Sequence, residues 1–333
     1  MGRFHLSGVF AALLFAACLV CGPQAQEAEE TFGCEANPTG NPIGGGEGYT
    51  PIFTKSDFIV TTADELIAAL KQAQPRQIIC VPGEIEIDLT PHATLGIPAG
   101  VTLAGCRGLN GSPGGLIAYR KSGRMLSTGG ESVRLTGLRF EGAEGGTGRV
   151  ATSSSFIGVG HWGFEIDNCE VFNFNSSAIG LGPDAVNAQV HHNYIHHNQM
   201  GGLGYGVSTS SSDAHIIANK FDYCRHHIAS SGSPGSGYEA AWNLVLENAT
   251  SHHFDMHGGR DRGDATDIAG DWMHIHHNTF IGTHRHVAIR GVPSDGAEIH
   301  HNWFANPAEK SISTGGNTHV YRNVYGPDRV LEE

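Results

Sequence analysis

A short motif recurs six times in the second half of this 333-residue chain. Each copy contains an apolar residue, two further residues, an asparagine, one more residue and then, in most copies, a bulky apolar residue. The asparagines are Asn193, Asn219, Asn248, Asn278, Asn302 and Asn323, which are separated by 26, 29, 30, 24 and 21 residues. A repeat of this length, rich in Gly, Asn and β-branched residues, is typical of stacked strands. The motif therefore predicts an all-β fold, a single-stranded right-handed parallel β-helix.

The repeated asparagines have a structural explanation. A buried side-chain amide at a sharp turn can donate to the coil on one side and accept from the coil on the other, and asparagine tolerates left-handed backbone. The histidine pairs at 191–192, 276–277 and 300–301 adjoin these turns, so we assign them a turn-stacking role. With 47 glycines and 16% charged residues, the chain is expected to form one elongated domain of roughly ten coils, each rising about 4.8 Å.

The N-terminal residues 1–26 have the features of a secretory signal. Arg3 precedes an apolar run at 9–21 that is too short to span a membrane, and small and polar residues follow. This pattern predicts a secreted or periplasmic protein without a transmembrane segment. Because FAAC at 15–18 partly fits a bacterial lipoprotein signal, lipid anchoring at Cys18 is the alternative.

The rest of the chain divides into a lead-in segment at 27–60 and a β-helix domain at 61–328. The domain begins with a predicted amphipathic helix at 61–75, where Thr62 and Glu65 form a capping box and Pro75 ends the helix. A solenoid must cover the apolar edge of its terminal coil. We therefore expect this helix to cap the first coil.

Several segments between residues 64 and 117 resemble a known superfamily. They read DELIAAL, IICVPGEIEI, IPAGVTLAGCRG and GGLIA, and they are similar to the opening coils of the pectate-lyase-like β-helix superfamily. Together with the asparagine repeats, the resemblance covers roughly residues 60–326. It implies a β-helix that acts on extended carbohydrate. Because the superfamily includes lyases, hydrolases, epimerases and phage tailspikes, the resemblance does not specify the reaction, which must be inferred from individual residues.

The residues that break the repeat are concentrated on a few coils. Five strand segments can be aligned on an inward apolar column of Val207, Ile228, Phe254, Val287 and Ile312. Alternation along each strand then places their neighbours on the outer face. Three adjacent coils present ionisable groups there, while the flanking coils present Gly and Ser. The predicted outer group consists of Arg225, His227, His253, Asp255, His257, His284, His286 and Arg290.

A local group of ionisable side chains on a strand face predicts a functional site. The strand face does not need such groups for stability, and stacked histidines repel one another when they are protonated. For an acidic polysaccharide the matching reaction is β-elimination: a cation neutralises the uronate carboxylate, a base removes the C5 proton and an acid protonates the glycosidic oxygen. The sequence therefore favours a polysaccharide lyase.

The catalytic roles are assigned by residue type. We expect Arg290, with Arg260 or Arg262, to neutralise the carboxylate. His253 or His257 is the predicted base, and His227 or Tyr238 the predicted acid, with Tyr238 brought near by an excursion at 230–242. Asp255 is expected to orient an imidazole. The predicted substrate-binding residues are Arg225, Arg260, Arg262, His284 and His286.

Members of the superfamily often use Arg or Lys as the base beside bound Ca²⁺, but this chain departs from that pattern. Its lysines, none of them in the predicted outer group, are Lys55, Lys71, Lys121, Lys220 and Lys310. Residue roles therefore cannot be transferred from those relatives.

Two metal ions, Ca²⁺ and Zn²⁺, are candidate cofactors, and the sequence alone does not decide whether the protein depends on a metal. An excursion at 258–272 carries Asp261, Asp264 and Asp267, whose hard oxygens suit Ca²⁺, although their spacing is not that of an EF-hand. Zn²⁺ is the second candidate. Its ligands would be His253, Asp255 and His257, spaced i, i+2 and i+4 on one strand, with His227 or His286 from a neighbouring coil.

Two other function classes stay open. One is a glycoside hydrolase, either metal-assisted or using two carboxylates, for which Asp255, Asp264 and Asp267 are the candidates. The other is a non-catalytic carbohydrate-binding β-helix, which would present aromatic platforms rather than ionisable groups. The formal net charge of −13 argues against nucleic acid as a partner. A local Arg and His patch can still attract an acidic polysaccharide at contact, because charges are screened beyond about 8 Å at physiological salt. We expect a monomer.

Overall fold

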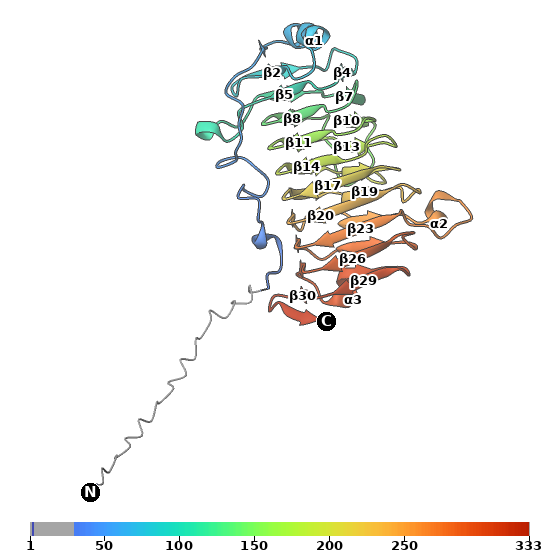
Figure 1. Ribbon diagram of the computed structural model, residues 1–333. Helices are drawn as coiled ribbons and strands as arrows, with labels where there is room; N and C mark the ends of the chain where they lie inside the picture. Colours follow the sequence, from blue (N-terminus) through green and yellow to red (C-terminus); the bar gives the residue numbers. More distant parts are fainter. Residues whose placement is uncertain (1, 3–29, 333) are drawn as a thin grey trace. The chain divides into compact units, whose positions relative to one another are not determined.

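Three long β-sheets wind around a common core in the computed structural model, which describes Gly2 and residues 30–332 (Figure 1). Each complete coil contributes one strand to each sheet, and the strands of successive coils pair in parallel, so the chain is the parallel β-helix predicted from the repeat. Sheet A contains β1 (Phe58–Ile59), β2 (Ile78–Cys80), β5 (Thr102–Ala104), β8 (Arg134–Thr136), β11 (Glu165–Asp167), β14 (Ala188–His191), β17 (Asp213–Ile217), β20 (Gly237–Ala241), β23 (Trp272–His276), β26 (Gly296–His300) and β29 (Thr318–Tyr321).

From β2 to β28, each strand of sheet A is followed along the chain by one strand of sheet B and then by one strand of sheet C. Sheet B contains β3 (Glu86–Asp88), β6 (Leu116–Ala118), β9 (Arg139–Glu141), β12 (Glu170–Phe172), β15 (Tyr194–Asn198), β18 (Lys220–Cys224), β21 (Leu244–Val245), β24 (Thr279–Phe280), β27 (Trp303–Phe304), β30 (Asn323–Tyr325) and β31 (Val330–Glu332). Sheet C contains β4 (Leu95–Ile97), β7 (Gly123–Thr128), β10 (Ser154–Val159), β13 (Ser177–Leu181), β16 (Tyr205–Thr209), β19 (His226–Ser230), β22 (Phe254–Met256), β25 (Val287–Ile289) and β28 (Ile312–Ser313).

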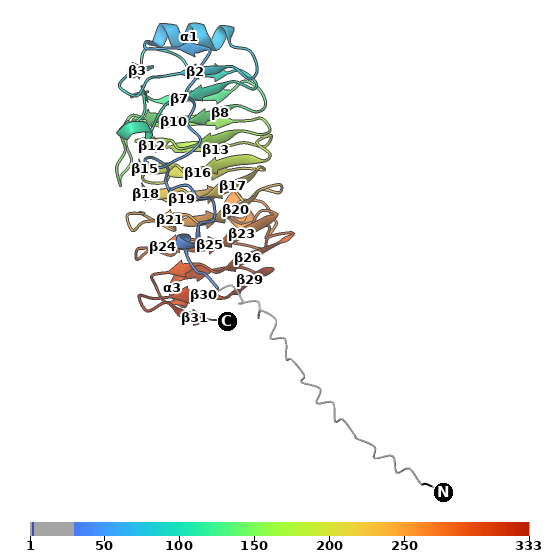
Figure 2. The ribbon, with the colours of Figure 1, turned by 60° about the vertical axis from the view of Figure 1, so that its left-hand side comes forward.

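The helices lie at the ends and edges of the coil stack. Helix α1 (Ala63–Gln72) covers the first coil (Figure 2), with Leu66 and Leu70 buried and the predicted capping box between Thr62 and Glu65 present. Helix α2 (Gly259–Arg262) lies in the predicted excursion, and α3 (Ala308–Ser311) precedes β28. Short 3₁₀ turns occupy Cys34–Ala36 and Leu109–Gly111, and β31 pairs antiparallel with β30.

An asparagine ladder joins the turns between sheets A and B, but one predicted member is wrong. Asn243, not Asn248, hydrogen-bonds to Asn219 and Asn278, with distances of 2.9 Å from Asn219 N to Asn243 Oδ1 and from Asn243 Nδ2 to Asn278 Oδ1. Asn248 instead donates to Asp222. The corrected spacings place the excursion at 258–272 between Asn243 and Asn278, which explains why these two lie 35 residues apart.

The histidine pairs beside the ladder have the predicted stacking role. His192, His277 and His301 have φ angles of 54°, 52° and 55°, the left-handed conformation of the turn. The rings of His277 and His301 stack with their centroids 4.9 Å apart.

The lead-in segment lies along the outside of these turns (Figure 2). Gly33 N donates to His301 O, Gly44 N donates to Ala218 O, and Tyr49 Oη donates to Asp167. The segment is therefore held by coils that are far apart in the sequence.

Among the described residues, no helix is long and apolar enough to cross a membrane. The predicted signal at 1–26 and the lipidation candidate Cys18 lie outside the residues that the structure describes, apart from Gly2.

Candidate functional site

The strand register on sheet C is the one predicted from the sequence. Val207 pairs with Ile228, Ile228 with Phe254, and Phe254 with Val287, and all four side chains are buried. The next outward residue on each strand forms a column along the helix axis. That column consists of Gly96, Ser127, Gly158, Gly180, Ser208, Ala229, Asp255, Ala288 and Ser313. Asp255 is the one charged member, and the small residues leave the face beside it open.

A groove with a volume of about 670 Å³ lies over this column. Gly158, Gly180, Ser208 and Ala229 contribute to its lining. The ionisable side chains among its described lining residues are Arg124, Tyr205 and His257, and none is a carboxylate. An acidic protein thus has a groove with local positive character, suited to an anionic ligand.

Asp255 is the centre of a polar group next to the groove. Its side chain is 0% exposed, yet Arg290 Nε donates to Oδ1 at 2.8 Å and a second guanidinium nitrogen donates to Oδ2. His257 Nε2 lies 3.2 Å from Oδ2, and His252 Nδ1 lies 3.4 Å from Oδ1. His226 Nε2 lies 3.3 Å from Oδ2. We call these five residues the Asp255 cluster.

The cluster keeps Asp255 ionised. Burial alone raises the pKa of this carboxyl, but hydrogen bonds from His252, His257 and Arg290 outweigh it and hold the pKa well below its usual value. An ionised carboxylate with this many donors can orient imidazole rings and stabilise their protonated form, but it cannot serve as an acid. Arg290 also donates to Asp261 Oδ1 at 3.1 Å, so two carboxylates compensate its charge.

The accessible histidines of the cluster are His252 and His257, whose side chains are 36% and 31% exposed. They lie at the two ends of one strand and contact different oxygens of the same carboxylate. His226 is fully buried, and burial lowers its pKa to about 4. Two oriented imidazoles on either side of one carboxylate can supply a base and an acid to a ligand lying over it.

Three predicted site histidines lie in the interior instead, which corrects the sequence-based placement. His227, His253 and His286 are each 0% exposed and form a column with ring centroids 5.2 Å apart. They pack against interior rings of sheet B, with Phe280 5.5 Å from His286 and Phe221 5.6 Å from His227. The chain turns from sheet B into sheet C here, so His227 and Ile228 both point inward and strict alternation fails.

Burial determines the charge of this interior column. It lowers the pKa of His227 to about 3 and that of His286 to about 4, and it lowers the pKa of His253 strongly. Both ring nitrogens of His227 and of His253 have no hydrogen-bond partner among the described residues. These neutral, enclosed rings cannot contact a substrate.

The remaining predicted residues are dispersed. Tyr238 is 1% exposed, lies on β20 of sheet A and has its pKa raised by burial, so it cannot be the acid. Arg262 donates to the backbone oxygens of Ser231, Gly232 and Ile268 and thereby holds the excursion. Arg260 and His284 are exposed and Arg225 is half-buried, outside the Asp255 contacts.

The predicted metal-ligand sets are not assembled in the described part of the chain. Asp261 accepts from Arg290, Asp264 accepts from Arg262 and Thr266, and Asp267 is exposed. The groups of three ligand side chains with atoms within 4.8 Å of one another are formed by other residues, on sheet A.

Sequence reasoning missed Arg124, Tyr205, His226 and His252. Tyr205 and His226 pair across sheet C and lie three residues before the outward column. Strict alternation would place outward side chains two residues before that column, and the inward turn at the corner adds the third residue. Arg124 lies on β7, outside the repeats used for the alignment. One sequence signal points to Arg124. The small residues that form the groove floor on the neighbouring coils continue back to Ser127, which lies on β7 with Arg124.

Comparisons with known proteins establish the fold alone. No protein-family model matches the chain, and no curated protein matches its sequence. Among solved structures, the alginate lyase from Paenibacillus sp. strain FPU-7 is similar, with a TM-score of 0.52 and 15% sequence identity. The similarity covers 81% of this chain and 97% of that chain.

Proposed function

We propose that this protein is a polysaccharide lyase that cleaves a uronate-containing polymer by β-elimination in the groove on sheet C. The observation that carries the proposal is the groove itself, with an arginine and a histidine but no carboxylate among its described lining residues, beside the Asp255 cluster. β-Elimination needs a carboxylate neutraliser, a base and an acid, and each has a candidate here.

Arg124 is the proposed carboxylate neutraliser. Its guanidinium lies over the groove floor, because a side-chain carbon at Gly158 would come within 2.6 to 2.7 Å of three of its atoms. The side chain has no hydrogen bond or ion pair with other described residues, unlike Arg290, which is bound to Asp255 and Asp261. An unpaired guanidinium in a groove can donate two parallel hydrogen bonds to a uronate carboxylate.

His257 and His252 are the proposed proton-transfer residues. His257 lines the groove and contacts Asp255, so we assign it the removal of the C5 proton. His252 contacts the other oxygen of Asp255 and is assigned protonation of the departing glycosidic oxygen. In the balanced step, His257 takes the C5 proton, the C4–O bond breaks, a C4–C5 double bond forms, and His252 gives a proton to the leaving oxygen.

The hydrolase alternative fits less well. A two-carboxylate hydrolase needs one carboxyl that can be protonated as an acid. Asp255 is held ionised by its donors, and no carboxylate is among the described residues that line the groove. A solved structure of similar fold is that of an alginate lyase, so alginate is the first polymer to test. Such polymers occur outside the cytoplasm, which agrees with the signal-like segment at 1–26.

The test follows the ultraviolet absorbance of the unsaturated uronide product on alginate, pectate, glucuronan and glycosaminoglycans, with and without chelator. We expect one polymer to give rising absorbance, and Arg124→Ala to reduce kcat/KM by about 10-fold to 100-fold, the cost of one charged hydrogen-bonding group. Lys71→Ala, which removes an exposed positive charge on α1, is the matched control. New reducing ends without absorbance would favour hydrolysis, and no product from any polymer would contradict the proposal.

A further inference from the structure

A second polar surface lies on the outer face of sheet A. The register places one column of alternating histidine and glutamate across five strands, which consists of His215, Glu239, His274, Glu298 and His319. The neighbouring outward column holds His276 and His300 on β23 and β26. Neither column belongs to sheet C, so the groove does not account for them.

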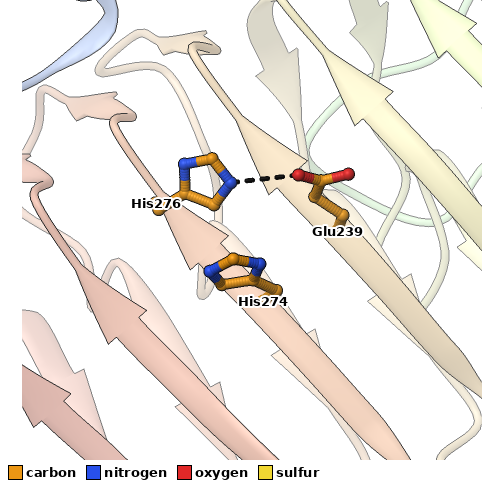
Figure 3. Close-up of side chains that lie close together, drawn as sticks. All are labelled: Glu239, His274 and His276. Atoms are coloured by element: carbon orange, nitrogen blue, oxygen red, sulfur yellow. Dashed lines mark hydrogen bonds and ion pairs between the residues drawn. The ribbon is translucent and has the colours of Figure 1, made fainter.

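Three of these side chains converge (Figure 3). Glu239 on β20 pairs directly with His274 on β23, and His276 follows two residues later on the same face. Glu239 Oε1 lies 3.0 Å from His276 Nε2, and the rings of His274 and His276 are 4.3 Å apart. One ligand atom from each residue lies within 4.8 Å of the other two. Two ligands of a tetrahedral ion with bonds of about 2.0 to 2.1 Å are roughly 3.3 Å apart, close to the Glu239–His276 distance.

The donor set suits a borderline transition metal. Two imidazoles and one carboxylate are ligands that Zn²⁺ prefers, whereas Ca²⁺ requires oxygen ligands. We propose that Glu239, His274 and His276 form a binding site for a divalent transition-metal ion of the Zn²⁺ type on sheet A. His274 also belongs to an adjacent group with Glu298 and His300, so the two groups share this ligand. Because one imidazole nitrogen binds one ion, we expect one ion for the two groups.

The third ligand group on sheet A differs because side chains of the protein already donate hydrogen bonds to its carboxylate. It consists of Glu165, Asp167 and His191. Arg134 Nε donates to Asp167 Oδ1 at 2.9 Å, and Tyr49 and Thr136 donate to Oδ2. A bound cation would have to displace that arginine. Glu239 instead faces imidazoles on both oxygens, with His215 Nδ1 2.7 Å from Oε2.

The ligands lie on rigid strands, which favours a preformed site. Strands β20 and β23 fix Glu239, His274 and His276 through their pairing, and β26 fixes His300, whose Nε2 lies 2.7 Å from His274 Nε2. An ion bound there would link adjacent coils without touching the groove. Binding to the folded state alone stabilises it by mass action.

The test is titration of the purified, chelator-dialysed protein with ZnCl₂ by calorimetry, with Co²⁺ absorption as a second readout of the ligand geometry. We expect one ion per chain and a higher melting temperature with metal. His274→Gln should bind Zn²⁺ at least about 100-fold more weakly, because loss of a direct ligand costs more than loss of a residue that only hydrogen-bonds to a ligand. His92→Gln is the matched control, and the melting temperatures without metal report whether His274→Gln still folds.

A complementary variant separates metal binding from a purely structural network. Glu239→Gln keeps the size of the side chain and one accepting oxygen but removes its charge, so we expect weaker Zn²⁺ binding with an intact fold. Absence of saturable binding to the wild type, or equal affinity in wild type, Glu239→Gln and His274→Gln, would overturn the proposal.

Discussion

The buried column of His227, His253 and His286 should make folding stability depend on pH between 7 and 5. Burial keeps these rings neutral in the folded protein, while the same histidines have a pKa near 6.5 in an unfolded chain. The unfolded state therefore binds more protons, and stability falls as the pH drops below about 6.5.

The size of the stability loss at low pH is set by protonation of these histidines in the unfolded state. At pH 5, protonation stabilises an unfolded histidine of pKa 6.5 by RT ln(1 + 10^1.5), about 2 kcal/mol, provided that the folded pKa is about 4 or lower. His227, with a pKa of about 3, and His286, with a pKa of about 4, both meet that condition. Each should therefore cost about 2 kcal/mol of stability at pH 5 and little at pH 7.

The assay compares the free energies of unfolding of the wild type and His227→Leu in denaturant at pH 7 and pH 5. The difference should move by about 2 kcal/mol in favour of the variant at the lower pH, because leucine cannot be protonated. His284→Leu, which replaces an exposed histidine, is the control and should show a much smaller change. If the His227→Leu difference is the same at both pH values, the assignment of a neutral interior histidine is refuted.

Other variants test the ladder and the site. Asn243→Ala should destabilise the fold by about 4 kcal/mol, since it removes four buried hydrogen bonds. Asn248→Ala removes one hydrogen bond and should cost less than about 1.5 kcal/mol; unfolding in denaturant measures both. Arg290→Lys keeps the charge but loses the paired contact with Asp255, so we expect kcat to fall by about tenfold or more with the melting temperature little changed. An unchanged kcat would exclude Arg290 from positioning the Asp255 cluster.

Much of the fold could be predicted because it follows from periodic features. The repeat length determined the coil, the capping box located α1, and the apolar column determined the register of sheet C, including the outward position of Asp255 and His257. Each of these rests on a local pattern that recurs from coil to coil. Hydrophobic burial reinforces such patterns at every repeat.

The sequence-based predictions are wrong where the backbone departs from the two-residue alternation of a strand or from the repeat motif. At the corner between sheets B and C two consecutive residues point inward, so the two-residue alternation placed His227, His253 and His286 outside and overlooked His226 and His252. The segment VLENAT fits the motif and therefore favours Asn248, whereas Asn243 follows the small residues Ala240 and Ala241. The corner conformation is a tertiary feature that a sequence pattern does not encode. The small Ala240 stands where the motif has a larger apolar residue, so the motif does not identify the asparagine that follows it.

The location of the catalytic site is tested most directly by comparing His257→Gln with His319→Gln in the elimination assay on the polymer that the wild type degrades. His257 contacts Asp255 at the groove, while His319 is exposed on sheet A. We expect His257→Gln to lower kcat by about 100-fold or more with an unchanged melting temperature, the loss expected for a proton-transfer residue, and His319→Gln to retain activity. Equal activity in the two variants would contradict the location of the catalytic site in the groove on sheet C.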